Sequence, residues 1–499
     1  MSKSSRQIKW GAILSYLSIF INILAGLLYT PWMIKQIGQS QYGLYTLANS
    51  LITMFLVDFG LSTATSRYVA KYRAENKPEE AERFLGMVYK LYLIIDAIIF
   101  AILFILFFFI DTIYANLTAL ELEQFKVVYI IAGSFAIINF PFVNLNGILN
   151  AYEKFIQLKL ADFIYRILIV VLTVSALICG LGLYALVAVH AIVGIIVIVY
   201  KLIIIKKTIP IKVNFKFYDA SLLKDISGFS IWATLSIIAQ RLIINITPTI
   251  LGIVADTRAI ALFGVVATIE GYAYTITSAI NGMFMPKIAR MYADEDKKQL
   301  DDLLIKVGRF QYALNGLIIA GFAILGQLFI SLWMGIEYIE AYICILLVIA
   351  PGIFFNSMQI ANTALVVEKK VQLQAIVNII IGVINVILSF VLSSQYGVIG
   401  ACISICIAYI IRVVLLLFIY QKKMKLNILG FIKHCYLKMC LPIIFTLCIG
   451  LLLNQWIKLD GWWGVLLTGI IVVVIYCIGI FLFGLNKEER KLIRNKLKK

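Results

Sequence analysis

Long apolar runs of about twenty residues alternate along this chain with short polar segments. Each run is continuously apolar rather than alternating, so each predicts an α-helix that crosses a bilayer and not a strand of a barrel. The pattern predicts fourteen spans, over residues 10–33, 42–64, 88–110, 126–150, 160–180, 182–204, 228–254, 260–284, 309–333, 341–366, 374–393, 397–420, 438–457 and 462–484. We therefore expect an all-α, polytopic membrane protein.

A charged, amphipathic segment over residues 58–85 occurs a second time in the chain. A shift of 219 residues places its second part on the segment that begins at Lys287. Segments that begin at residues 42, 153 and 182 also match segments that begin at 260, 368 and 397, in the same order and at shifts of 215 to 218. Ordered matches of this kind indicate a duplicated half.

The repeat predicts how the chain is divided. We expect an N-terminal lobe over residues 1–205 with six spans, and a cytoplasmic linker over residues 206–227. A C-terminal lobe over residues 228–425 holds six more spans, and residues 426–499 form two appended helices and a basic tail. Because each half holds an even number of spans, the halves are parallel repeats, which is a transporter arrangement with a substrate site between lobes.

Composition and charge support a membrane protein. The 499 residues are 62% hydrophobic and 14% charged, which excludes a soluble protein of this length. With the N-terminus in the cytoplasm, 38 of the 44 Lys and Arg residues lie on the cytoplasmic side. This asymmetry is the positive-inside pattern, so the net charge of +18 indicates topology and some contact with anionic lipid rather than nucleic-acid binding. Both termini are expected in the cytoplasm.

Arg241 is the first candidate for a functional side chain. It lies in the middle of a predicted span, where a charged group usually faces a wet cavity or a partner. Thr234, Arg241, Asn245 and Thr249 share one helical face, and Pro248 is expected to loosen the helix there. A guanidinium matches the oxygens of a phosphate, so Arg241 is interpreted as an anion-binding group; the alternative is a structural ion pair.

Acidic residues near Arg241 and near the repeated segment are the next candidates. Glu270 shares a helical face with Asn281, and it either pairs with Arg241 or carries a proton during transport. Asp58 and Arg67 flank the inner end of the second span. Asp58 is a candidate for ion coupling and Arg67 for substrate binding, whereas the plain interpretation is snorkelling and pairing at a helix end.

Three more ionisable residues lie within spans. Arg166 is a candidate for substrate binding, and its plain interpretation is a local pair with Asp162 four residues earlier. His190 is either a proton relay or a core residue. Arg412 is expected to snorkel to the cytoplasmic surface. Because the repeat does not duplicate these charges, they favour one asymmetric substrate between the halves.

Motifs for other classes of protein do not occur. The chain has no GxxxxGK[ST] loop for nucleotide phosphates, and its two histidines form no catalytic arrangement with serine and aspartate. Its eight cysteines mostly lie in apolar helices, and none completes a zinc pattern. We therefore expect no metal, no cofactor and no enzymatic activity.

Two short motifs carry a family resemblance. Residues 37–45 read IGQSQYGLY, and the later sequence DFGL at residues 58–61 is followed by RYVA at residues 67–70. Together with a first span that ends in Pro31, they resemble the polysaccharide-transport family of flippases, within the multidrug, oligosaccharidyl-lipid and polysaccharide exporter (MOP) superfamily. The resemblance covers essentially the whole chain. One departure is Gln240, which stands where family members often have an Asp before the Arg.

The resemblance implies a function and a setting. It implies two V-shaped lobes in the bacterial cytoplasmic membrane and alternating access that flips a polyprenyl-pyrophosphate-linked oligosaccharide to the outer leaflet. The product would feed O-antigen, capsule or exopolysaccharide assembly, with H⁺ or Na⁺ as coupling ion and polysaccharide polymerase machinery as partner. Since a sugar-pyrophosphate group loses its water in hydrocarbon, a cavity must replace that water, and Asn22, Asn245 and Asn281 are candidates to contact the sugar.

Alternatives stay open at this point. A multidrug or cation antiporter of the same superfamily would need buried acids where this chain offers Arg241. A flippase for the peptidoglycan precursor is a second alternative. A membrane polymerase or ligase is a third, and it would need a large outer loop, whereas every predicted outer loop is short.

Overall fold

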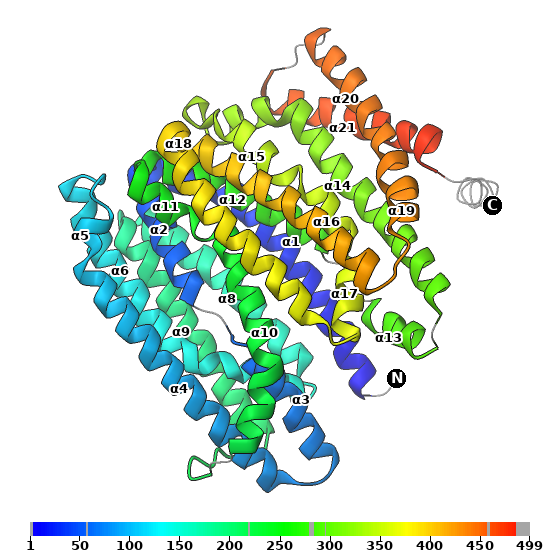
Figure 1. The fold of residues 1–499 in the computed structure, drawn as a ribbon. Helices are drawn as coiled ribbons and strands as arrows, with labels where there is room; N and C mark the ends of the chain where they lie inside the picture. The colour runs from blue at the N-terminus through cyan, green and yellow to red at the C-terminus, as the bar shows by residue number, and fades with distance from the viewer. Residues whose placement is uncertain are drawn as a thin grey trace. The chain divides into compact units, whose positions relative to one another are not determined.

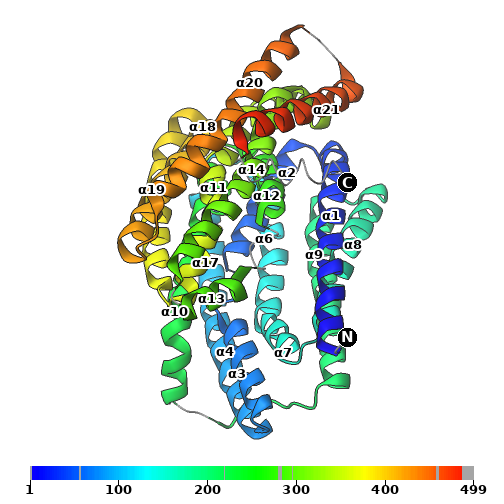
Figure 2. The same cartoon turned by 90° about the vertical axis from the view of Figure 1, so that its right-hand side faces the viewer.

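The protein is all-helical throughout the part of the chain that the computed structural model describes, residues 3–55, 58–217, 220–278, 284–294, 296–456 and 460–485 (Figure 1 and Figure 2). The chain forms two compact units, Met1–Ala261 and Leu262–Lys499. The predicted all-α membrane architecture is confirmed. The basic tail beyond residue 485 lies outside the described residues.

The first unit is built from helices that follow the predicted apolar runs. They are α1 (Lys3–Ile37), α2 (Gln39–Phe55), α3 (Leu61–Ala74), α4 (Pro78–Phe108), α5 (Ile110–Ile113), α6 (Ala119–Asn139), α7 (Leu145–Ala151), α8 (Phe155–Ile178), α9 (Leu183–Thr208), α10 (Ala220–Ile244) and α11 (Thr247–Val254). Helix α12 (Thr257–Ser278) starts in this unit and continues into the second.

The second unit continues with a similar series. It contains α13 (Met285–Ala293), α14 (Lys297–Trp333), α15 (Ala341–Ile349), α16 (Gly352–Ser357), α17 (Gln359–Val367), α18 (Val371–Lys423), α19 (Ile428–Phe431), α20 (Lys438–Trp456) and α21 (Gly461–Gly479). Two π-helical segments, Ile432–Leu437 and Ile480–Gly484, adjoin α20 and α21.

Among the described helices, nine are long and apolar enough to cross a membrane, or up to eleven if each of two bent pairs forms one span. One of the nine, α18, contains two predicted spans, because the chain folds back at Gly397 with φ 54° and ψ −133°. The hydroxyls of Ser389 and Ser404 bond across this hairpin, and the backbone of its two arms meets at Gly400. The total of fourteen spans stays a prediction.

The duplicated half is visible in the helix boundaries. Helices α3 and α13 end at Ala74 and Ala293, and α4 and α14 start at Pro78 and Lys297, so both pairs are 219 residues apart (293 − 74 and 297 − 78). The turns that follow α7 and α17 each contain the same backbone hydrogen bond, at positions that are 216 residues apart in the sequence. In each, the N–H of a lysine (Lys154, Lys370) donates to the carbonyl five residues earlier at 2.9 Å. The two halves therefore repeat the same local structure.

A clasp around Glu121 ties the start of α12 to the first unit, to which α10 and α11 also belong. The carboxylate of Glu121 accepts hydrogen bonds from the hydroxyl of Ser40 at 2.6 Å and from that of Thr257 at 2.7 Å. Gly43 lies against the carbonyl oxygen of Thr257, where a Cβ would overlap it. The boundary between the compact units thus falls within α12, and the division of the sequence into lobes at residue 228 stays a prediction.

The linker after α9 is held against the first turns of α4. The N–H of Asn214 donates to the carbonyl of Glu82 at 3.1 Å, and the ammonium of Lys90 donates to the carbonyl of Phe217 at 3.1 Å. Gly86 lets the linker approach, since a Cβ there would overlap the carbonyl of Asn214. Residues 212–217 therefore form a strap on α4 rather than a free connection.

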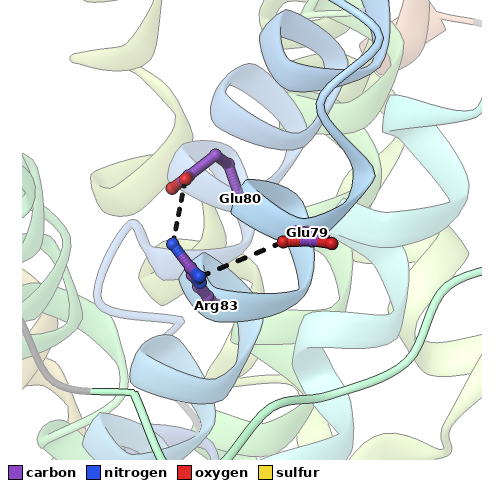
Figure 3. Close-up of polar contacts among 3 residues, drawn as sticks. All are labelled: Glu79, Glu80 and Arg83. Carbon is purple, nitrogen blue, oxygen red and sulfur yellow. Dashed lines mark hydrogen bonds and ion pairs between the residues drawn. The ribbon is translucent and has the colours of Figure 1, made fainter.

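Charged side chains mark the start of α4 beside this strap. Figure 3 shows Arg83 between Glu80, at 3.1 Å, and Glu79, at 4.0 Å. The acidic residues favour the positive end of the helix dipole, whereas the exposed pairs themselves add little stability. The guanidinium of Arg83 also lies 5.5 Å from the ring centroid of Phe217, which adds a contact to the strap.

Candidate functional site

Arg241 lies at a break in a membrane span. Helix α10 ends at Ile244, and its last part, Thr234–Ile244, is bent by 42° from α11. Pro248 is buried in the first turn of α11, so the predicted loosening of the helix next to Arg241 is confirmed. Arg241 is half-buried, and the N–H of Asn245 donates to its carbonyl at 3.0 Å.

The break gives Arg241 and Asn245 a particular chemistry. A helix end carries partial negative charge on its last carbonyls, and an arginine in the last turn is favourable there. The half-buried Asn245 lies in the two-residue break beside Arg241. A cation and an amide at a bent span can bind an anion that carries hydroxyl groups.

Asp58 is a structural group at the start of α3. Its carboxylate accepts hydrogen bonds from the hydroxyl of Tyr92 at 2.6 Å and from the N–H of Ser62 at 3.2 Å. The next two residues, Phe59 and Gly60, have positive φ values of 51° and 68°, so the chain turns sharply here. Asp58 thus stabilises the turn into α3, and its role in ion coupling stays a prediction.

The structure contradicts the predicted local pair of Arg166. Asp162 instead pairs with Lys159, whose ammonium lies 3.3 Å from its carboxylate. Arg166 is half-buried on α8 and makes no ion pair within the described parts of the chain. The local pair expected from the i,i+4 spacing is therefore replaced by an i,i+3 pair of Asp162 with Lys159, and the role of Arg166 in substrate binding stays a prediction.

His190 is held by an aromatic neighbour. Its Nε2 atom lies 2.9 Å from the hydroxyl of Tyr45, and the two ring centroids are 5.9 Å apart. The ring of Tyr42 lies 6.3 Å from that of Tyr45. This contact supports the interpretation as a core residue that has its hydrogen-bond partner; the proton-relay role stays a prediction.

The other predicted site residues differ in their exposure to solvent. Arg67 is exposed on α3, and Asn22 is exposed on α1. Asn281 lies outside the described residues. Glu270 is half-buried in the second unit whereas Arg241 belongs to the first, so their pairing stays a prediction.

Arg412 was assigned wrongly from the sequence. It is only 3% exposed, and its guanidinium lies 4.0 Å from the ring centroid of Phe355 instead of at the surface. The signal that could have found it is distance along the helix. Lys422, at the end of the helix that was predicted to be cytoplasmic, is ten residues away, or about 15 Å, which exceeds the reach of an arginine side chain.

The described helices and the cations among them define a multi-pass membrane protein with the fold of MOP-superfamily transporters. The solved structure of the lipid II flippase MurJ in an inward closed conformation matches with a TM-score of 0.76, at 18% identity, over 95% of this chain and 98% of that one. A multidrug resistance MATE family transporter of the MOP superfamily matches with a TM-score of 0.69, at 14% identity, over 85% and 99%.

The particular family follows from the sequence. The model of the family described as "Polysaccharide biosynthesis protein" matches residues 8–292, more than half of the chain, and the chain belongs to that family. It is 24% identical over 506 residues to the "Uncharacterized membrane protein EpsK" of Bacillus subtilis (strain 168), covering 97% of this chain and 96% of that protein. A second relative is the "Capsular polysaccharide biosynthesis protein CapF" of Staphylococcus aureus, at 24% identity over 33% of this chain and 41% of that protein.

Proposed function

We propose that this protein is a flippase for a polyprenyl-pyrophosphate-linked oligosaccharide. It would move the repeat unit from the cytoplasmic to the outer leaflet of a bacterial cytoplasmic membrane by alternating access, with both termini in the cytoplasm. The product would feed the assembly of O-antigen, capsule or exopolysaccharide. Family membership supports a role in polysaccharide biosynthesis, and the fold supports transport.

The observation that carries this proposal is Arg166, a cation within a membrane span that makes no ion pair in the described residues. A lone charge at this depth is costly, and such residues are usually retained because they meet a substrate or water. Arg241, at the break between α10 and α11, adds a second cation to the same unit. Two intramembrane arginines suit a substrate that carries a pyrophosphate.

Two other functions share this fold. The MATE structures belong to multidrug transporters, and a cation exporter would need acids where the first unit places Arg166 and Arg241. The likeness to MurJ favours a flippase of a lipid-linked precursor, and lipid II is the second candidate substrate. The substrate that accumulates when the protein is missing separates the three functions.

The test is deletion of the gene followed by extraction of the membrane lipids. We expect a polyprenyl-linked repeat unit to accumulate on the cytoplasmic leaflet while surface polysaccharide falls. Mass spectrometry of the lipid extract identifies the sugar. Accumulation of lipid II would replace this proposal by the peptidoglycan precursor, and greater drug sensitivity with normal surface polysaccharide would support the exporter.

Arg241→Ala tests the role of the cation itself. We expect it to abolish surface polysaccharide at unchanged protein abundance, because a neutral side chain cannot bind the phosphate oxygens. Arg241→Lys should restore the polymer only in part, since an ammonium lacks the bidentate geometry. Lys207→Ala is the control, because Lys207 is an exposed cation at the end of α9 and is not a candidate for substrate binding. Normal surface polymer in Arg241→Ala would show that Arg241 does not bind the substrate.

A further inference from the structure

The second unit holds a buried cation, Arg412, to which the proposed function assigns no role. Arg412 lies on the second arm of the α18 hairpin and is 3% exposed. Its Nε and Nη2 atoms are buried and have no hydrogen-bond partner in the described parts of the chain. The guanidinium lies against the ring of Phe355, with the ring centroid at 4.0 Å.

Tyr274 and Tyr409 lie near this guanidinium, and Glu270 lies near both tyrosines; these three side chains and Phe355 define the Arg412 cluster. Glu270 and Tyr274 lie one turn apart on α12, and Tyr409 lies one turn before Arg412 on α18. Each of the two tyrosines is close enough to both Glu270 and Arg412 to interact with their charges. Tyr274 is 46% exposed, so the cluster reaches the surface of the second unit.

The cluster is incomplete as a structural ion pair. A buried guanidinium needs an acceptor for its donors, because leaving them unmade costs the full desolvation of the charged group. A cation–π contact with Phe355 offsets only part of this cost. Glu270 and Arg412 are not among the ion pairs of the described residues. An anion at this place would satisfy the unmet donors of Arg412.

We propose that the Arg412 cluster binds the phosphate of a phosphorylated sugar. The donors of Arg412 bind the phosphate oxygens, the exposed ring of Tyr274 packs against the sugar, and Glu270 accepts hydrogen bonds from its hydroxyls. This inference rests on the proposed function and deepens it, because it assigns a substrate site within the second unit. The carboxylate of Glu270 repels the phosphate. The site therefore favours a ligand that turns its hydroxyl groups, and not its phosphate, toward Glu270.

Binding measurements on the purified full-length protein test the site. The probes are inorganic pyrophosphate, geranylgeranyl pyrophosphate and glucose 1-phosphate, with calorimetry as the readout. We expect Arg412→Gln to weaken binding of all three by about ten- to a hundredfold, as expected for the loss of a hydrogen-bonded charge. Glu270→Gln should tighten binding of inorganic pyrophosphate, since it removes a negative charge near the phosphate.

Thermal unfolding keeps the test valid if a variant is unstable. Pyrophosphate should raise the midpoint temperature of the wild-type protein and not that of Arg412→Gln. Without ligand, Arg412→Gln should be at least as stable as wild type, because it removes an unpaired buried charge. A marked loss of stability in both Arg412→Gln and Glu270→Gln would overturn the proposal, because it would indicate a structural pair.

The source of the phosphate and the proposed function are tested separately. Nanodiscs of phosphatidylglycerol are compared with nanodiscs of phosphatidylcholine. Loss of pyrophosphate binding only in phosphatidylglycerol would overturn the substrate site and assign the cluster to a lipid headgroup. If binding depends on Arg412 but deletion of the gene leaves surface polysaccharide normal, the site is upheld and the proposed function is refuted. Unchanged binding in Arg412→Gln would refute the site alone.

Discussion

The attachment of the C-terminal helices depends on one buried side chain, Arg309 on α14. It is 5% exposed, and its guanidinium donates to the carbonyl of His434 at 3.1 Å and to that of Gly484 at 2.7 Å. The two acceptors lie in the π-helical segments that adjoin α20 and α21. Arg309→Ala removes both contacts at once, and we expect it to loosen the two helices from α14.

The magnitude follows from the type of bond. A hydrogen bond from a charged donor contributes about 1.5–3 kcal/mol, so these two bonds together contribute about 3–6 kcal/mol. Removing a buried charge recovers part of its desolvation cost. We therefore expect Arg309→Ala to lower the free energy of unfolding by about 2–4 kcal/mol. The free energy of unfolding of Arg309→Lys should lie between those of the wild type and Arg309→Ala, because a point charge cannot bind both carbonyls in the geometry of the guanidinium.

Equilibrium unfolding in mixed micelles, followed by tryptophan fluorescence, measures this change. Limited proteolysis should also cleave faster between α20 and α21, since the hairpin opens more often. Lys306→Ala is the matched control, because Lys306 is exposed on the same helix and should change stability by less than about 0.5 kcal/mol. If Arg309→Ala and Lys306→Ala have the same free energy of unfolding, the two carbonyl contacts do not hold α20 and α21 on α14.

Two further predictions concern the first unit. Glu121→Ala removes the acceptor of Thr257 and should lower the free energy of unfolding by about 1–3 kcal/mol in the same assay; an unchanged value would mean that the clasp contributes no stability. Gly86→Ala should displace the strap at Asn214 and speed its cleavage by protease, whereas Gly133→Ala, where a Cβ meets only a side chain at 3.8 Å, should not. Equal cleavage of the two variants would show that the linker is not held on α4.

The sequence predicted the features that depend on neighbouring residues and on the membrane as solvent. Continuous apolar runs must become helices in hydrocarbon, because each backbone polar group then finds its partner within the same segment. The same rule makes a break recognisable: Gly397 separates two predicted spans, and the structure folds back there. The repeat also belongs to this class, since equal segments form equal turns after Ala74 and Ala293.

The partners of the polar side chains could not be predicted in this way. Asp162 pairs with Lys159 and leaves Arg166 without an ion pair in the described residues, although both spacings suit a helix. Asp58 bonds to Tyr92, which is 34 residues away, and no local pattern indicates that contact. Arg412 was expected at the surface and is buried on Phe355. The candidate site is therefore known from the sequence only as a set of intramembrane charges.

The sequence alone thus determined that the chain is a duplicated helical membrane protein, because hydropathy and helix boundaries are set by residues close together in the chain. The tertiary structure alone decided which charges have a partner and which have none within the described residues, as Asp162 and Arg166 illustrate. The physical reason is that the energy of a buried charge depends on the groups that helices distant in sequence bring to it. Those groups are placed by packing, and packing is not encoded in the period of the apolar residues.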